Sequence, residues 1–113
     1  MSNILTPGQQ LLPGQAISST NNGYELILQN DGNLVLYRTI DMKPLWATGT
    51  DGKAIQRAIM QGDGNFVLYF YNGSPAWASG TNGKPGSYLI MQDDGNAVIY
   101  WPNDPLWATN TVQ

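Results

Sequence analysis

The chain has 113 residues, which suffices for one compact domain and is too short for two ordinary ones. It contains neither cysteine nor histidine, so disulfides, thiolate or histidine zinc sites, a cysteine nucleophile and a Ser–His–Asp triad are all excluded. Only 12% of the residues are charged, and the net charge is −3. The few scattered cations cannot form the basic patch that nucleic acids or anionic membranes require, so we expect neither partner.

The first 16 residues do not resemble a signal peptide. They lack a basic start and place Pro7-Gly8 and Pro13-Gly14 where an apolar stretch would lie. The localisation therefore stays open between a mature secreted form and cytoplasmic synthesis followed by release through another route. The chain contains no run of 18 apolar residues, so we expect no membrane insertion.

The first strong strand signal spans residues 26–37. Strand-forming residues flank Asp31-Gly32, a pair that is typical of hairpin turns. A two-residue loop would place Gln29 and the valine of the second strand on opposite faces. A three-residue loop instead pairs Gln29 with Asn33 and ends on a glycine, which readily adopts a positive φ. We predict the three-residue loop and, because no segment shows a capped helical period, an all-β fold.

The same hairpin recurs twice. Residues 28–37, 60–69 and 91–100 align without gaps. A second motif, proline, any residue, Trp-Ala and then Thr or Ser, recurs in phase at 44–48, 75–79 and 105–109. The chain therefore consists of three copies of a unit of about 31 residues.

Side-chain alternation gives each hairpin two faces. The apolar face is predicted to form the core and comprises Leu26, Leu28, Leu34, Leu36, Met60, Phe66, Leu68, Leu89, Met91, Ala97 and Ile99. Three small sheets of this kind become stable by packing their apolar faces together about a pseudo-threefold axis. Trp46, Trp77 and Trp107 recur once per unit and are predicted to fill that axis, with a sugar-stacking platform as the alternative.

The opposite face carries a polar set that is complete in every copy. Its members are Gln29, Asp31, Asn33, Val35 and Tyr37; Gln61, Asp63, Asn65, Val67 and Tyr69; and Gln92, Asp94, Asn96, Val98 and Tyr100. Amides, a carboxylate and a phenol around a methyl-bearing patch suit the hydroxyls and C–H face of a neutral sugar. Turn chemistry alone is the alternative for the Asp-Gly-Asn part, but it does not account for a glutamine and a tyrosine in every copy.

The motif Gln-x-Asp-x-Asn-x-Val-x-Tyr in triplicate, interleaved with Trp-Ala-Thr/Ser, resembles the bulb-type (monocot, snowdrop-like) mannose-binding lectin family. The resemblance covers essentially the whole chain, so residues 1–113 are expected to be a single lectin domain. It implies a β-prism II fold of three four-stranded antiparallel sheets around a Trp-lined core, and metal-independent, cofactor-free binding of α-D-mannose at each sheet. It further implies that Asp31 and Asn33 meet the 2-hydroxyl, Gln29 the 3-hydroxyl and Tyr37 the 4-hydroxyl, with Val35 against the ring carbons. Equivalent roles fall on the other two sets.

The resemblance also implies partners, and the sequence departs from the plant members in two respects. We expect mannose-rich glycans on glycoproteins or cell surfaces to be the ligands, with weak single sites strengthened by multivalency. A homodimer formed by exchange of the C-terminal strand is implied, and residues 107–113 are long enough for it. The chain lacks the disulfide usual in plant members. The second position of the motif also differs between copies (Asn30, Gly62, Asp93), which predicts unequal selectivity at the loop edges.

Three other functions are weaker alternatives. A glycosidase needs two facing carboxylates, and each unit offers one aspartate in its motif. A calcium loop of the EF-hand type needs a terminal glutamate, and the only glutamate is Glu25. The same prism could instead serve as a structural or protein-interaction module, such as an inhibitor or a bacteriocin-like domain with some sugar sites inactive. Three intact polar sets favour the lectin over each of these.

Overall fold

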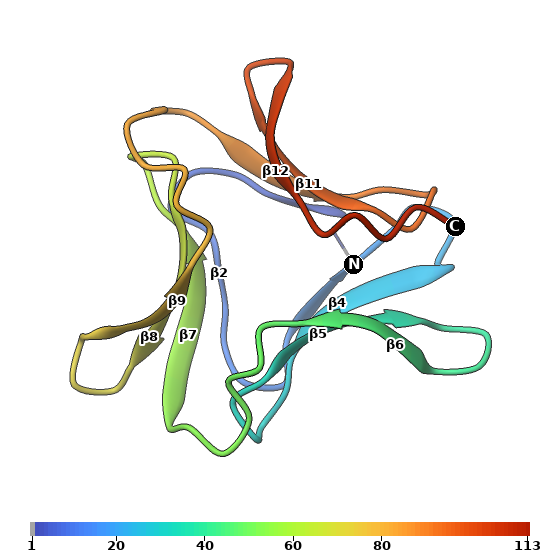
Figure 1. The fold of residues 1–113 in the computed structure, drawn as a ribbon, viewed down its shortest axis with the longest axis horizontal. Coiled ribbons are helices and arrows are strands. Elements are labelled where there is room, and N and C mark those ends of the chain that lie inside the picture. The colour runs from blue at the N-terminus through green and yellow to red at the C-terminus, as the bar shows by residue number, and fades with distance from the viewer. Residues whose placement is uncertain (1) are drawn as a thin grey trace.

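The computed structural model describes residues 2–113 and shows twelve strands in three four-stranded antiparallel sheets, which confirms the predicted fold class. In Figure 1 the three sheets form the sides of a triangle around a common centre. Within the described residues, no helix has the length and apolar character needed to cross a membrane.

Each sheet is named here after the repeat that supplies most of it. The first sheet has the order β3 (Ala16–Ser18), β4 (Tyr24–Leu28), β5 (Leu34–Arg38) and β6 (Lys43–Ala47). The second has the order β2 (Gln10–Leu11), β7 (Ile55–Met60), β8 (Phe66–Phe70) and β9 (Pro75–Ala78). The third has the order β1 (Ile4–Leu5), β10 (Tyr88–Met91), β11 (Ala97–Trp101) and β12 (Asp104–Ala108).

The N-terminal segment supplies one edge strand to each sheet in turn. Its apolar residues Leu5, Leu11 and Ile17 lie six positions apart, and all three are buried. Between them, Gly8 and Gly14 adopt φ values of 88° and 90°, so the chain turns a corner and reaches the next sheet. The pattern Pro-Gly-Gln at residues 7–9 and 13–15 is the sequence signal of this six-residue repeat, and the sequence analysis did not use it.

The hairpin loop has the predicted three-residue form in all three repeats. The backbone N–H of Gln29 donates to the carbonyl of Asn33 at 2.9 Å, and Gly32 follows with φ 93°. A Cβ atom on Gly32 would lie 2.2 Å from the carbonyl oxygen of Lys53, so the loop needs glycine for space as well as for its backbone angle. The register then pairs Ile27 with Val35, and the apolar and polar faces separate as predicted.

The core consists of the apolar face predicted from the alternation, together with the three residues of the N-terminal repeat and Ile55 and Ala58. Trp46, Trp77 and Trp107 form a triangle at one end of this core. Their ring centroids are 5.4–5.7 Å apart and their planes cross at 73–75°, which is the edge-to-face geometry that aromatic rings prefer. The tryptophans are half-buried, so they close one end of the prism while leucines, methionines and Phe66 fill its middle.

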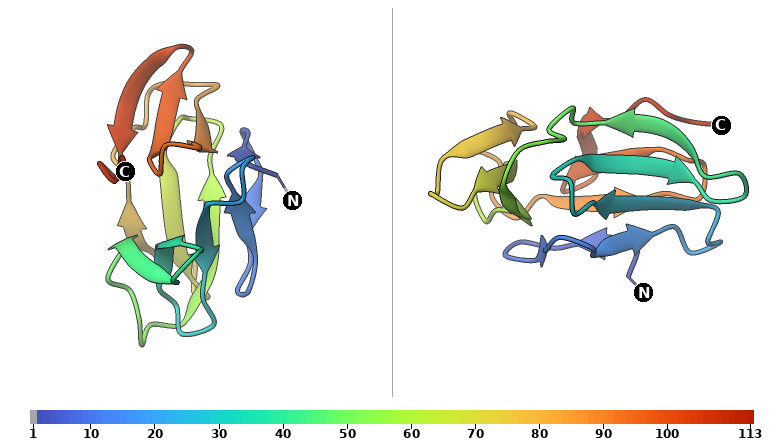
Figure 2. Two further views of the ribbon diagram at one scale, coloured as in Figure 1. Left: turned by 90° about the vertical axis from the view of Figure 1, so that its right-hand side faces the viewer. Right: turned by 90° about the horizontal axis from the view of Figure 1, so that it is seen from below.

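The two ends of the prism differ in construction. The tryptophan strands β6, β9 and β12 form one edge of each sheet, and the short strands β1, β2 and β3 form the opposite edge. Figure 2 shows the N-terminal strands together at one end and β6 with the C-terminal segment toward the other. The backbone of the C-terminal segment pairs within its own sheet: β12 pairs with β11, and Gln113 N–H donates to the carbonyl of Asp94 at 2.8 Å. The side chain of Gln113 reaches the first sheet, where its Oε1 accepts from Arg38 Nη1 at 3.1 Å.

Candidate functional site

The structure brings each predicted polar set together on the outer face of one hairpin. We name these clusters site 1 (Gln29, Asp31, Asn33, Val35, Tyr37), site 2 (Gln61, Asp63, Asn65, Val67, Tyr69) and site 3 (Gln92, Asp94, Asn96, Val98, Tyr100). Burial follows the same pattern in all three: the aspartate is exposed, the glutamine, asparagine and tyrosine are half-buried, and the valine is buried. The valines lie on the outer face but are covered by their neighbours.

A direct contact joins the glutamine and the tyrosine of every site. Gln29 meets the hydroxyl of Tyr37 at 2.5 Å, Gln92 meets that of Tyr100 at 2.6 Å, and Gln61 makes the same contact with Tyr69. In site 1 the amide fits best with its oxygen accepting from Tyr37 Oη. Its Nε2 then lies 3.3 Å from both carboxylate oxygens of Asp31. Carboxylate, amide and phenol thus form one continuous polar row.

The aspartate of each site uses one carboxylate oxygen in its own turn. Asp31 Oδ1 accepts from the backbone N–H of Asn33 at 2.9 Å, and the same bond recurs at Asp63 and Asp94. This is the turn chemistry that the sequence offered as an alternative, and it accounts for half of the carboxylate. The other oxygen lies 3.3 Å from Gln29 Nε2 at site 1, and at sites 2 and 3 it accepts no hydrogen bond within the described residues, so it has capacity to accept one from a ligand.

The asparagine of each site divides its amide between the fold and the open face. Asn33 Oδ1 accepts from the backbone N–H groups of Gly49 at 3.0 Å and Thr50 at 3.2 Å. Asn65 does the same with the matching pair in the second repeat, and Asn96 accepts from Thr111 N–H. Within the described chain the Nδ2 groups make no hydrogen bond, so each asparagine offers its two N–H donors to a ligand.

Two hydroxyl residues in each repeat hold the asparagine, and the sequence analysis missed them. They are Thr48 and Thr50, Ser79 and Thr81, and Thr109 and Thr111, and the two hydroxyls of each pair lie 2.7–2.8 Å apart. The second hydroxyl also donates to the carbonyl of the turn glycine, as from Thr50 to Gly32 at 2.7 Å. The signal was present in the sequence, since a threonine follows each of the three tryptophans at the fourth position.

An isoleucine completes the apolar floor of each site and was also missed. Ile27, Ile59 and Ile90 pair across the sheet with the buried valines of sites 1, 2 and 3. All three are half-buried on the outer face. Each lies two residues before the glutamine of its site, a spacing that was visible in the sequence. The floor is therefore a pair of branched apolar side chains bordered by hydrogen-bonding groups.

Comparisons with known proteins agree with this geometry. No family model matches the chain. It is 49% identical over 69 residues to a mannose-specific lectin of Narcissus pseudonarcissus, a match that spans 59% of the length of that relative. The structure superposes on the mannose-specific agglutinin of snowdrop (Galanthus nivalis), solved with methyl-α-D-mannoside, with a TM-score of 0.78, 40% identity and 99% coverage of both chains. The chain belongs to the bulb-type mannose-binding lectin family.

A lectin of known structure from a bacterium is also similar. A domain-swapped lectin dimer from Mycobacterium smegmatis is 47% identical over 92% of this chain and 95% of its own, with a TM-score of 0.57. The relatives are lectins rather than enzymes, so this chain belongs to a lectin family and not to an enzyme family.

The three sites of this bulb-type lectin differ at the second position of the motif. In site 3 that residue, Asp93, is held by the loop between β3 and β4. Its carboxylate accepts from Asn21 N–H at 3.0 Å and from the hydroxyl of Thr20 at 2.7 and 2.9 Å. These hydrogen bonds, that from Asn21 first, lower the pKa of Asp93 below its ordinary value of 3.8. The loop of site 3 is therefore tied to a neighbouring sheet.

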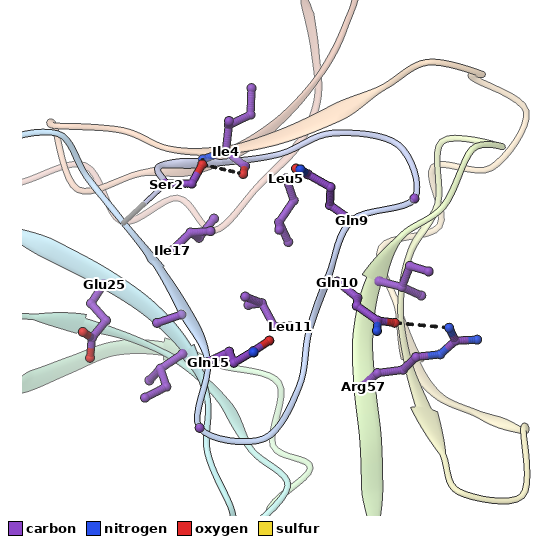
Figure 3. Close-up of a pocket in the computed structure, with 15 residues that line it drawn as sticks. Ser2, Ile4, Leu5, Gln9, Gln10, Leu11, Gln15, Ile17, Glu25 and Arg57 are labelled. Atoms are coloured by element: carbon purple, nitrogen blue, oxygen red, sulfur yellow. Dashed lines mark hydrogen bonds between the residues drawn. The ribbon is translucent and has the colours of Figure 1, made fainter.

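The N-terminal end of the lectin prism carries a hollow of about 780 Å³. Leu5, Leu11 and Ile17 face its centre, and the polar side chains of Gln10 and Arg57 border it on the second sheet (Figure 3). None of the residues of sites 1 to 3 is among its lining residues. It lies on the side of the sheets opposite the tryptophan triangle, beside the outer-face isoleucines Ile27 and Ile59.

Proposed function

We propose that residues 1–113 form one lectin domain that binds α-D-mannose and mannose-rich glycans at sites 1, 2 and 3 without a metal ion. The observation that carries the proposal is the Nδ2 group of each site asparagine, which has no hydrogen-bond partner within the described residues. The Oδ1 of the same asparagine accepts from the backbone, and the same site supplies a carboxylate, an amide–phenol pair and an apolar floor. The snowdrop relative, described as mannose-specific, superposes on the whole chain and adds support.

Each group of the site takes a defined role toward the sugar. The asparagine Nδ2 donates to the 2-hydroxyl and the aspartate accepts from it, the glutamine meets the 3-hydroxyl and the tyrosine the 4-hydroxyl. The paired valine and isoleucine contact the C–H face of the ring. Selectivity for mannose over glucose then follows, because the 2-epimer would leave the asparagine and aspartate of each site unpaired.

High affinity for a glycan comes from the number of sites that bind it at once, because each single site is weak. Four or five hydrogen bonds contribute about 0.5–1.5 kcal/mol each before ordering costs, so a monosaccharide should bind in the millimolar range. The three sites lie on three different sides of the triangle in Figure 1 and face different directions. Such an arrangement favours crosslinking of branched glycans, with avidity gains on the order of 10²–10⁴.

The test compares the wild type with the triple variant Asn33→Asp, Asn65→Asp and Asn96→Asp. Aspartate keeps the oxygen that accepts from the backbone and replaces the Nδ2 donor by a charged oxygen at a half-buried position, so the fold should survive. We expect the wild type to bind high-mannose glycans on an array, with inhibition by methyl α-mannoside but not by EDTA, and the triple variant to lose this binding. Binding that persists in the triple variant would show that these sites do not hold the sugar, and loss with EDTA would contradict metal independence.

We also propose a homodimer formed by exchange of the C-terminal strand. The domain-swapped dimer of the Mycobacterium smegmatis relative supports this assembly, and residues 104–113 form the outermost strand and tail of the third sheet. Light scattering during size-exclusion chromatography should give about 25 kDa, twice the 12.3 kDa of one chain. A mass of one chain across micromolar concentrations would refute the exchange.

A further inference from the structure

One position beside each proposed sugar site changes its chemistry from repeat to repeat. The residue paired across the sheet with the site tyrosine is Glu25 in site 1, Arg57 in site 2 and Tyr88 in site 3. The five motif residues and the floor isoleucine are identical in all three sites. The tyrosine end of the site is therefore acidic in the first sheet, basic in the second and aromatic in the third.

Arg57 is held in place beside Tyr69. Its guanidinium carbon lies 5.5 Å from the centroid of the Tyr69 ring, and Nη1 donates to Gln10 Oε1 at 3.2 Å (Figure 3). Its Nε is buried and has no hydrogen-bond partner. A buried N–H without a partner is costly, so the side chain gains if a small movement brings Nε to an acceptor.

Arg57 also has no ion-pair partner. The ion pair found within residues 2–113 joins Arg38 and Asp41, and no carboxylate lies within 4.0 Å of Arg57. Arg57 and Ile59 both line the hollow at the N-terminal end, so the guanidinium borders open space next to the floor of site 2. A guanidinium without an ion-pair partner at the rim of a sugar site is well suited to bind a phosphate or sulfate group.

We propose that site 2 prefers mannosides that carry an anionic phosphate or sulfate group at the end of the ring that meets Tyr69, with Arg57 as the specificity-determining residue. The proposal rests on the proposed function, since it requires the sugar itself to bind at site 2. Glu25 disfavours the same ligand at site 1 by charge repulsion. Tyr88, whose ring lies 5.9 Å from that of Tyr100, offers site 3 an uncharged aromatic surface instead.

The experiment isolates one site at a time. The double variant Asn33→Asp and Asn96→Asp leaves site 2 as the one intact site. Calorimetry or NMR titration then compares the affinity of this variant for methyl α-mannoside with its affinity for the 6-phosphate of that sugar. We expect the phosphorylated sugar to bind about fivefold more tightly at low salt, with the advantage reduced at high salt because the pair is exposed to screening. Arg57→Gln in this background should remove the preference and leave the affinity for methyl α-mannoside within about twofold.

Placing an arginine at the equivalent position of site 1 provides the matched control. In the background that leaves site 1 (Asn65→Asp with Asn96→Asp), the phosphorylated sugar should bind more weakly than methyl α-mannoside, and Glu25→Arg should reverse that order. An unchanged preference after Arg57→Gln, or competition by inorganic phosphate as effective as that by the phosphorylated sugar, would overturn the assignment. If methyl α-mannoside itself fails to bind at site 2, the proposed function fails there, which is a separate result from binding without a preference.

Discussion

Replacing Asn33 by alanine and by aspartate separates the structural half of this side chain from its proposed ligand-binding half. Alanine removes the oxygen that accepts from Gly49 N–H at 3.0 Å and Thr50 N–H at 3.2 Å. Thr50 is buried, so its N–H loses its partner without access to water, whereas Gly49 is exposed and can turn to solvent. Aspartate retains an oxygen in the same place and strengthens rather than removes these bonds.

The magnitude follows from these two bonds. At about 0.5–1.5 kcal/mol for each hydrogen bond, with the buried donor at the upper end, Asn33→Ala should lower the free energy of unfolding by about 2 kcal/mol. For a domain of this size that corresponds to a fall in Tm of about 10 °C. Asn33→Asp should stay within about 0.5 kcal/mol of the wild type, because the accepting oxygen remains and the added charge strengthens its two bonds while it is repelled by Asp31 two residues away.

Urea unfolding followed by tryptophan fluorescence measures both variants, since the tryptophan triangle reports on the whole core. Titration with methyl α-mannoside in the background that leaves site 1 measures binding. Both variants should lose binding at that site, and only the alanine variant should lose stability. If Asn33→Ala unfolds at the wild-type urea concentration, or if both variants lose stability equally, then Oδ1 does not stabilise the fold in the way proposed here.

Three further predictions concern stability. Gly64→Ala should lower the free energy of unfolding in urea by more than about 2 kcal/mol, because the new Cβ would lie 2.3 Å from the Lys84 carbonyl. Gly83→Ala is the control: its φ is also positive but the space around it is open, so it should cost only about 1 kcal/mol. Equal losses would contradict the steric argument. Trp77→Ala should cost about 3–5 kcal/mol by calorimetry, since it opens the aromatic triangle, and a loss under about 1 kcal/mol would show that the triangle does not hold the sheets together. The pKa of Asp93 is lowered in the folded chain, so its contribution to folding stability is complete above the ordinary pKa of 3.8 and is lost as the pH falls below that value. Asp93→Asn should therefore flatten the dependence of Tm on pH between about 4 and 2. An unchanged slope would refute this linkage.

Much of the candidate site followed from short-range patterns. Strand alternation and the turn glycine at position 32 were enough to place Gln29, Asn33 and Tyr37 on one face, because both rules act over a few residues. The same alternation separated the core leucines from the polar set. Local rules could not show that the oxygen of Asn33 is consumed by backbone groups about 16 residues further along the chain, since that contact exists only after the hairpin and the following segment have packed.

The sequence by itself determined the repeat, the all-β class, the hairpin register and the residues that share each polar face, because period and turn chemistry are local properties of the chain. Only the tertiary structure decided which strand completes each sheet, and it showed that the N-terminal segment serves all three in turn. It also decided that the tryptophans close one end of the core and that Arg57 lies beside Tyr69 without an ion-pair partner. These features arise from contacts between segments far apart in the chain, and a pattern along one segment does not specify its distant neighbours.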